Sequence, residues 1–364
     1  MIRFAVEAAR RGHSVDIFGQ EPVEPGIGRE LAATGAGWYT VADLLRRPLA
    51  GRRRLARDYD VLHVNLFSTR SPLTMLSLMA WPARVLFVDH ASRRTSGIGL
   101  RARAGGAIDR VLMSRVAGVA AVSKYVTNLD RARMGIDHPR LRTIYNGVDV
   151  VRFHPPPVRA RAPDTITLIT ASQLIPEKGV GHMIRAMKGL PSSCRLQIAG
   201  DGPSESQLRS LARSLDVHDR VEFLGVRSDL QDLYRHADIY VHPATWQEAF
   251  GISIVEAMAS GCAVVASDVG AIPELIQPGH TGLIVPPGDV VALRSAIMRL
   301  VQEPDVRLRL GDRARERAAT AFRIERCIAE HLDFCEQLMD PALVGRGRNA
   351  AGAFRAGAGG RGSR

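Results

Sequence analysis

Two glutamates, Glu248 and Glu256, stand at the ends of the segment EAFGISIVEAM, which covers residues 248–258. The residues between them are apolar apart from glycine and serine, and a helix is expected to begin near Ile252. Free backbone N–H groups at a helix start favour an anion such as phosphate. Carboxylates beside such a site accept hydrogen bonds from hydroxyl groups instead. The segment therefore predicts a ligand with a diphosphate in the middle and a polyol at each end, the layout of a nucleotide-sugar.

Two glycine-containing loops are candidates to hold the diphosphate. The segment SQLIPEKGV (172–180) joins a predicted strand to a predicted helix, which places Lys178 and Gly179 at a helix N-terminus. The segment AGDGPSESQL (199–208) also joins strand to helix, and Gly200 and Gly202 allow the backbone to approach a ligand closely. Taken alone, each loop is explained equally well as a solvated surface turn.

The elements that must position these loops follow an α/β pattern in both halves of the chain. Short apolar runs typical of buried parallel strands alternate with segments of helical spacing. We expect strands over residues 14–19, 59–65, 83–90, 116–123, 165–172, 194–200, 220–225, 238–243 and 263–268. Two serial α/β units predict two Rossmann-like domains facing a cleft, with ligands bound beyond the carboxyl ends of the strands.

Proline content and composition divide the chain further. HPPPVRARAPD (154–164) contains four prolines and separates the two series of strands. The predicted segments are a first α/β domain at 1–152, a linker at 153–164, a second α/β domain at 165–320, a last helix at 321–340 and a disordered Gly/Ala/Arg tail at 341–364.

The composition excludes several classes of protein. Apolar residues make up 46% and charged residues 24% of the 364 residues, which suits a globular chain of two domains. No run of 18 apolar residues is present, so no transmembrane helix is predicted, and the N-terminus lacks a signal-peptide pattern. The four cysteines show neither metal-ligand nor disulfide spacing, and we expect them to be buried thiols in a reducing cytoplasm.

The net charge of +12 is concentrated in arginine-rich segments. Residues 43–58 and 91–115 hold six arginines each, and the tail 341–364 holds five and no acid. Anionic lipid and nucleic acid both suit such segments, and a solvated basic face is the third alternative. Aromatic residues are only 5% of the chain and do not alternate with the basic ones, which argues against a nucleic-acid platform. We therefore expect no specific nucleic-acid partner.

The second half resembles the retaining GT-B glycosyltransferases of the large bacterial group with an EKG loop and an E-x7-E motif (glycosyltransferase family 4-like). The matching blocks are NGVD (146–149), RFHP (152–155), LIPEKG (174–179), AGDGP (199–203), EFLG (222–225), DIYVHPATWQEAFGISIVEAMASGCAVVASDVGAIPELI (238–276) and TGLIVPPGD (281–289). The first half is similar more loosely, through RGHSV (11–15), DVLHVN (60–65), His90 and VSK (122–124). The last helix resembles the family's crossover helix, which returns to the first domain.

This resemblance implies transfer of a hexose from a nucleotide-diphosphate sugar to a glycan or lipid-linked acceptor, by a front-face mechanism without a metal or other cofactor. The first domain would hold the acceptor. Lys178 would bind the diphosphate, Glu256 the ribose and Glu248 the donor sugar, and His90 would face the sugar from the first domain; Lys178, Glu248 and His90 are the expected catalytic residues. The expected donor-binding residues are Gln173, Lys178, Gly179, Gly200, Gly202, Glu248, Ala249, Phe250, Gly251, Ile252 and Glu256.

The chain departs from the family pattern at two places. Gln173 stands where relatives usually have an arginine, so a charge-assisted contact to the donor phosphate is replaced by a neutral amide. The chain also opens inside a helical pattern at residues 2–13, without the first strand and glycine-rich loop of such domains. We expect the true start to lie upstream of Met1.

These departures leave two alternatives to the transferase hypothesis. One is a catalytically impaired or silent protein that binds sugar nucleotides, and the other is an epimerase or phosphorylase on the same architecture. The expected location is the cytoplasm, with the inner face of the membrane as a docking surface for the segments 43–58 and 91–115.

Overall fold

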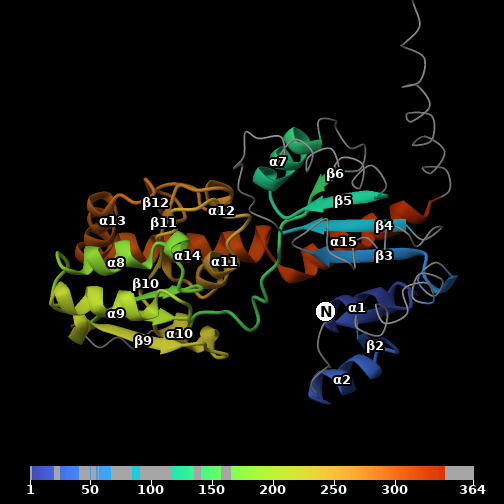
Figure 1. Ribbon diagram of the computed structural model, residues 1–364, viewed down its shortest axis with the longest axis horizontal. Coiled ribbons are helices and arrows are strands. Elements are labelled where there is room, and N and C mark those ends of the chain that lie inside the picture. Colours follow the sequence, from blue (N-terminus) through green and yellow to red (C-terminus); the bar gives the residue numbers. More distant parts are fainter. Residues whose placement is uncertain are drawn as a thin grey trace, which may run out of the picture.

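The structure is a computed structural model that describes residues 2–19, 25–40, 50, 55, 57–66, 84–90, 116–134, 141–156 and 165–340. Two α/β halves lie side by side, and the last helix reaches from the second half back to the first (Figure 1). The segment 91–115, most of 43–58, linker residues 157–164 and the tail 341–364 lie outside the described residues. Expectations about these segments and about the start of the chain stay predictions.

The first half contains short parallel sheets with helices beside them. Its elements are α1 (Ile2–Arg10), β1 (Asp16–Gly19), α2 (Pro25–Ala32), β2 (Gly37–Thr40), β3 (Val61–Leu66), β4 (Arg84–Asp89), β5 (Gly118–Ala121), α7 (Lys124–Met134) and β6 (Leu141–Thr143). Strand β1 pairs with β2, and β3 to β6 form a separate sheet in chain order. The four predicted strands of this half are confirmed. We did not predict β2 and β6, because both are short and carry too few apolar residues to be distinguished from loops.

The second half is a six-stranded parallel sheet with helices on both faces (Figure 1). Its strands are β7 (Ile166–Ala171), β8 (Cys194–Ala199), β9 (Val221–Gly225), β10 (Ile239–His242), β11 (Ala263–Ser267) and β12 (Leu283–Val285). Its helices are the short turns η1 (Pro176–Lys178) and η2 (His218–Arg220) and the α-helices α8 (Val180–Met187), α9 (Glu205–Ser214), α10 (Leu230–His236), α11 (Ile252–Ala259), α12 (Ile272–Leu275), α13 (Val290–Gln302) and α14 (Pro304–Ala321). The five predicted strands are confirmed, and the three-residue β12 was missed.

The strand order in this sheet is β9-β8-β7-β10-β11-β12. The chain therefore winds outward from β7 to one edge, returns to the other side of β7 and winds outward to the opposite edge. In such a sheet the loops after the two central strands leave in opposite directions and open a crevice, which is where ligands bind. The crevice lies after β7 and β10, which are paired at Leu168–Ile239 and Ile169–Tyr240.

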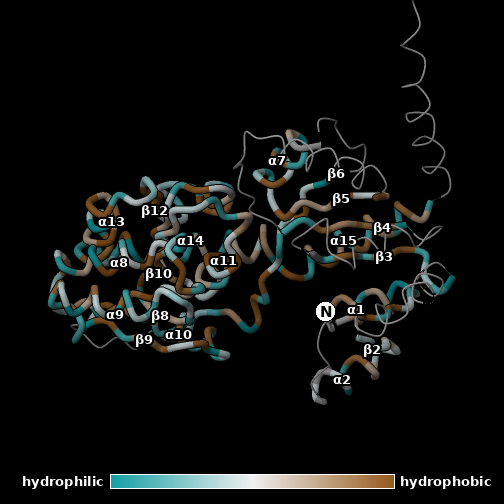
Figure 2. Tube along the Cα trace, viewed as in Figure 1, coloured by the Kyte–Doolittle hydropathy of each residue, from teal (hydrophilic) through white to brown (hydrophobic). Residues whose placement is uncertain are grey.

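Apolar side chains fill the space between this sheet and its helices. Every residue of β10 and β11 is buried, as expected for central strands covered on both faces. Helix α8 buries Val180, Met183, Ile184 and Met187, which follow the helical repeat and form one face. Along the helices of this half, apolar and polar stretches alternate (Figure 2).

The last helix, α15 (Ile324–Met339), packs against the first half. Ile328 and Leu332 contact Ala8 of α1, and the Phe334 ring lies against β5 so closely that a Cβ on Gly118 would be 2.7 Å from it. Burying a side chain such as phenylalanine contributes about 1.5–3 kcal/mol. The predicted crossover helix is therefore confirmed. None of the described helices combines the length and the apolar composition needed to cross a membrane.

Candidate active site

The loop after β7 places Lys178 and Gly179 at the crevice. Residues 176–178 form a 3₁₀ turn, and Gly179 leads into α8 with φ of 68°. A Cβ on Gly179 would lie 1.8 Å from the carbonyl oxygen of Pro243, so only glycine fits between the two loops. The backbone N–H of Thr245 donates to the carbonyl of Glu177 at 2.9 Å. The loops after β7 and β10 are therefore in direct contact beside the crevice.

The glycine loop after β8 packs against the loop after β7. A Cβ on Gly200 would lie 2.0 Å from the Ser172 carbonyl oxygen, and Leu174 N–H donates to the Asp201 carbonyl at 2.6 Å. Gly200 and Gly202 both have positive φ, of 127° and 152°. Close approach between two loops is thus a sufficient reason for the glycine at position 200, whatever ligand these loops bind.

Lys178 and Glu248 form an ion pair at the crevice. The Nζ atom of Lys178 lies 2.6 Å from Oε1 of Glu248, and the two side chains are 27% and 14% exposed. Burial alone would raise the pKa of Glu248, but the hydrogen bond from His242 and the charges of His242 and Lys178 outweigh it and lower the pKa to about 2. Glu248 is therefore a carboxylate throughout the physiological pH range.

A chain of buried polar side chains stands behind Glu248. His242, the last residue of β10, is 3% exposed, and its Nε2 lies 3.2 Å from Oε1 of Glu248. Its Nδ1 lies 3.2 Å from the hydroxyl of Tyr240, which donates to Ser253 Oγ at 2.8 Å. Sequence reasoning missed this chain, because Tyr240 and His242 are part of an apolar strand pattern. The alternation of side chains along a strand puts both residues on one face, and this is the signal that we overlooked.

Glu256 occupies the helix that follows the same loop. Helix α11 begins after Gly251, and Glu256 stands three residues beyond Ser253, so the two side chains share a helix face. Burial raises the pKa of Glu256 to about 7, and the charge of Arg152 counteracts this only in part. Such a raised pKa marks a carboxyl that is removed from water without a close partner, which is typical of ligand sites.

The other predicted donor-binding residues differ in how exposed they are. Gln173 is exposed, and Ile252 is an exposed apolar residue at the start of α11. Ala249 and Phe250 are buried. The Phe250 ring lies 6.1 Å from that of Tyr145 in the first half. Backbone groups of this loop can therefore face a ligand, but the side chains of Ala249 and Phe250 belong to the core.

His90, the predicted contact from the first domain, lies at the end of β4 in a separate polar cluster. Its Nε2 is 3.2 Å from Oδ1 of Asn65, whose amide is 3.0 Å from Nδ1 of His63. His63 Nε2 is in turn 3.1 Å from Nδ1 of His331 on α15. Burial lowers the pKa of His63 to about 3 and of His331 to about 4, so these rings are neutral. The side chain of Glu248 hydrogen-bonds Lys178 and His242, and not His90. Of the three expected catalytic residues, Lys178 and Glu248 therefore contact each other, and His90 lies in a separate cluster.

Glu274 connects the two halves. Its carboxylate accepts from the backbone N–H groups of Lys124 and Tyr125 at 2.8 and 2.6 Å, at the start of α7, and from the Tyr145 hydroxyl at 2.9 Å. A carboxylate from the second half thus caps a helix of the first half, where charge and free N–H groups favour it. Sequence reasoning gave Glu274 no role, because a contact across about 150 residues leaves no local pattern.

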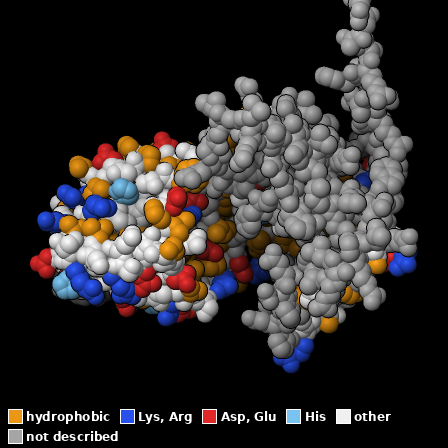
Figure 3. Space-filling model, viewed as in Figure 1, with side chains coloured by type: hydrophobic (Ala, Val, Ile, Leu, Met, Phe, Trp, Pro, Cys, Tyr) orange, Lys and Arg blue, Asp and Glu red, His pale blue; other side chains and the backbone are white. Residues whose placement is uncertain are grey.

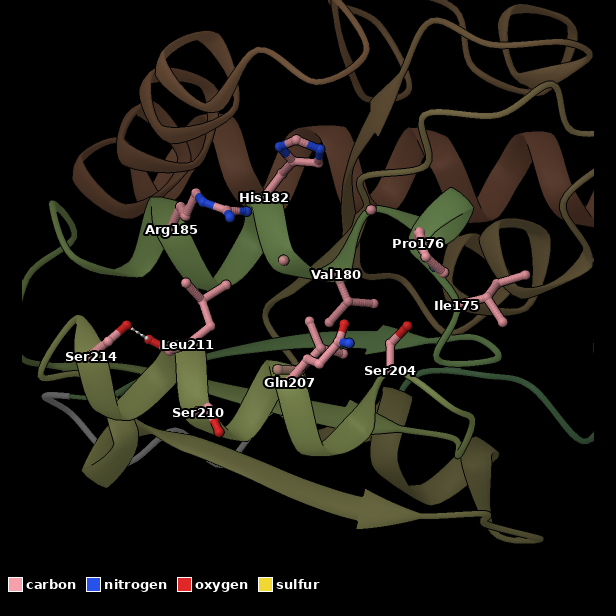
Figure 4. Close-up of a pocket in the computed structure, with 13 residues that line it drawn as sticks. Ile175, Pro176, Val180, His182, Arg185, Ser204, Gln207, Ser210, Leu211 and Ser214 are labelled. Carbon is pink, nitrogen blue, oxygen red and sulfur yellow. Dashed lines mark hydrogen bonds between the residues drawn. The ribbon is translucent and has the colours of Figure 1, made fainter.

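A groove of about 570 Å³ lies between α8 and α9 (Figure 4). It runs from Ile175 and Pro176, past Val180, to Arg185 and Ser214. Of the predicted donor-binding residues only Gly179 lines it, and neither acid does. Lys178, Glu248 and Glu256 therefore lie outside the lining of this groove.

Within the described residues, no group of three or more His, Cys, Asp or Glu side chains is arranged to hold a metal ion. None of the four cysteines forms a disulfide; Cys194 and Cys262 are buried, and Cys327 and Cys335 are half-buried. The expectation of a metal-independent reaction stays a prediction.

Comparison with known proteins identifies the family. The family described as "Glycosyl transferases group 1" matches residues 156–317, and the one described as "Glycosyltransferase Family 4" matches residues 1–152. Among solved structures, a glycosyltransferase of Rickettsia africae has a TM-score of 0.77 at 19% identity, over 93% of this chain and 95% of that one. The Anabaena protein HepE, in complex with UDP, has a TM-score of 0.76 at 20% identity, over 92% and 95%. These similarities show that the fold is GT-B.

Relatives with similar sequences include the following three. An exopolysaccharide phosphotransferase of Streptomyces coelicolor is 32% identical over 77% of this chain, which spans only 29% of that protein. A lipopolysaccharide core biosynthesis mannosyltransferase of Rhizobium leguminosarum is 30% identical over 84% of this chain and 87% of its own length. A phosphatidyl-myo-inositol mannosyltransferase of Mycolicibacterium smegmatis is 32% identical over 71% and 67%. The chain therefore belongs to the GT-B glycosyltransferases of the family 4 type, with a group 1 glycosyltransferase domain in its second half.

Proposed function

We propose that this protein is a retaining hexosyltransferase that moves a sugar from a nucleoside-diphosphate donor to a glycan or lipid-linked acceptor. The observation that carries the proposal is the Lys178–Glu248 ion pair at the switch point of the sheet, with Glu256 on the next helix. Lysine offers a mobile positive charge for a diphosphate. The two carboxylates offer acceptors for the hydroxyl groups of a sugar and a ribose.

The relatives that this chain covers over most of their length support mannose as the transferred sugar. Two of them are named mannosyltransferases, and another, from Mycobacterium tuberculosis, is named as GDP-mannose-dependent at 28% identity. We therefore propose GDP-mannose as the first donor to test, with UDP-glucose and ADP-glucose as the comparison donors.

In the proposed reaction the acceptor oxygen attacks C1 of the sugar on the face from which the diphosphate leaves. The bond between C1 and the phosphate oxygen breaks, the new glycosidic bond forms, and the acceptor proton passes to the departing phosphate oxygen. Lys178 stabilises the negative charge that develops on the diphosphate, which is commonly the largest catalytic contribution. Glu248 accepts hydrogen bonds from the sugar hydroxyls and holds C1 in place. The step uses no metal ion, so transfer is expected to persist in EDTA.

The test is transfer of isotope-labelled sugar to membrane glycolipid extracts, together with donor hydrolysis without acceptor. Lys178→Ala is expected to lower the rate by roughly a hundredfold or more. Lys188→Ala is the matched control, because Lys188 is an exposed lysine at the end of α8 in the same half. Anomeric retention is checked by NMR of the product. Donor binding without transfer or hydrolysis would instead favour the silent sugar-nucleotide-binding alternative, for which the neutral, exposed Gln173 is the supporting observation.

We also propose that the arginine-rich segments 43–58 and 91–115 attach the protein to anionic membrane, where a lipid-linked acceptor would be found. The second half shows side chains of both charges interspersed on the face drawn in Figure 3 and no single basic patch there. Neutralising Arg93, Arg94, Arg101 and Arg103 together is expected to abolish cosedimentation with anionic liposomes. Unchanged cosedimentation would refute this part of the proposal.

A further inference from the structure

Glu248 is held through only one of its two carboxylate oxygens. Lys178 Nζ at 2.6 Å and His242 Nε2 at 3.2 Å both contact Oε1. Within the described part of the chain nothing hydrogen-bonds Oε2, and this atom is not sealed from solvent. A carboxylate oxygen has lone pairs for two hydrogen bonds, so Oε2 is the atom that can accept from a ligand hydroxyl.

His242 is the more rigid of the two partners of Glu248. Its side chain is 4% exposed, whereas that of Lys178 is 27% exposed and carries four rotatable bonds. Because a carboxylate can only accept, Nε2 of His242 must be the donor in their contact. The other ring nitrogen lies 3.2 Å from the Tyr240 hydroxyl, and the two rings stack with centroids 6.2 Å apart. The imidazole is therefore held by the hydrogen bond from Nε2 and by the stacking of its face on the Tyr240 ring.

The same chain of contacts reaches the helix that carries Glu256. Tyr240 donates to Ser253 Oγ at 2.8 Å, in the first turn of α11. The backbone carbonyl of Glu248 also accepts from Ala271 N–H at 2.9 Å. One side-chain network thus connects strand β10, the loop that carries Glu248 and the start of α11, and these three elements form one wall of the crevice.

We propose that His242 is a positioning residue for sugar transfer: it holds Oε1 of Glu248 so that Oε2 faces the hydroxyls of the donor sugar while Lys178 is free to move to the diphosphate. This inference rests on the proposed function and names a residue that acts on the same site through Glu248. Binding of the donor diphosphate competes for Lys178. Without His242, the carboxylate would lose its remaining partner at that moment and would rotate about its side-chain bonds.

The test compares His242→Leu with His242→Gln in the full chain. Glutamine can place an amide N–H near the position of Nε2, whereas leucine keeps the volume and removes the donor. His242→Leu is expected to lower kcat roughly ten- to a hundredfold, by the loss of a hydrogen bond to a charged group, and His242→Gln is expected to restore most of it. His182→Leu is the matched control and is expected to leave kcat unchanged, since His182 lies on α8 and no side chain or backbone group in the described ranges hydrogen-bonds its Nδ1.

A second readout separates positioning from a merely structural role. The groups that face Glu248 are Lys178 and His242, with Tyr240 and Glu256 nearby. Because His242 lowers the pKa of Glu248, its replacement by leucine is expected to raise that pKa, and a pH titration of the Glu248 carboxyl by ¹³C NMR measures this directly. An unchanged rate and an unchanged Glu248 pKa in His242→Leu, while the wild-type protein transfers sugar, would overturn the inference. An equal loss of rate in both variants, with lower Tm and an unchanged Glu248 pKa, would also overturn it. Absence of transfer by the wild-type protein would instead count against the proposed function.

Discussion

Replacing Glu256 by glutamine is expected to stabilise the folded protein and to weaken donor binding at the same time. The carboxyl is half-buried, and burial raises its pKa from 4.5 to about 7. The unfolded chain therefore gives up this proton near pH 4.5 and the folded chain only near pH 7. Stability decreases between these two pH values, and the loss is complete above the folded pKa. Glutamine has nearly the same shape and no proton to lose, so it avoids this cost.

The size of the effect follows from the two pKa values. Ionising such a carboxyl in the folded protein costs about 3 kcal/mol relative to the unfolded chain at pH 8, and about 1 kcal/mol at pH 5. For domains of about 150–250 residues, 1 kcal/mol shifts Tm by roughly 2–4 °C. Glu256→Gln is therefore expected to raise Tm by about 5 °C or more at pH 8 and by about 2 °C at pH 5.

The assay is thermal unfolding of Glu256→Gln and wild type at both pH values, with and without donor. Glu316→Gln, an exposed position on α14, is the control and should shift Tm equally little at both. Because glutamine accepts hydroxyl hydrogen bonds less strongly than a carboxylate, the stabilisation by added donor should shrink in Glu256→Gln. An equal Tm gain at pH 5 and pH 8, or undiminished stabilisation by donor, would refute the assignment of Glu256 as a desolvated ribose acceptor.

Two further substitutions test the donor loop and the contact between the halves. Gln173→Arg is expected to speed transfer roughly tenfold, because a guanidinium adds a charge-assisted contact to the diphosphate. Steady-state kinetics of Gln173→Arg, Gln173→Ala and wild type check this. Equal rates in all three would place residue 173 away from the donor. Glu274→Gln keeps the shape of the cap on α7 but removes its charge, which is expected to weaken the contact between the halves by about 1–2 kcal/mol. Small-angle scattering should then report a larger radius of gyration, and an unchanged profile would contradict this role of Glu274.

The sequence was sufficient for those features whose signals are local. Lys178 and Glu248 lie in short loops that follow strongly apolar strands, and Glu256 lies in the helix after the second of these loops. The strand ends and the polar residues near them were therefore predictable. The strands β2, β6 and β12 have three or four residues each, too few for an alternating pattern to stand out.

The remaining features depend on contacts between distant residues. His63 and His331 meet across 268 residues, and their burial and hydrogen bond follow only from the return of α15 to the first half. Glu274 reaches the start of α7 because the two halves pack together. His242 was overlooked for a different reason: a histidine at the end of a buried strand fits the core, and only the path of the loop after β10 shows that this loop brings Glu248 back to the ring.

Isothermal titration calorimetry with nucleotide-sugars tests the central claim most directly, since Lys178, Glu248 and Glu256 are held to form a single donor site. The wild-type protein is expected to bind at least one of GDP-mannose, UDP-glucose and ADP-glucose with measurable heat, and the combined variant Glu248→Gln, Glu256→Gln is expected to lose that heat while it stays folded. Absence of heat from every donor with the wild-type protein, or equal affinity in the double variant, would contradict the account.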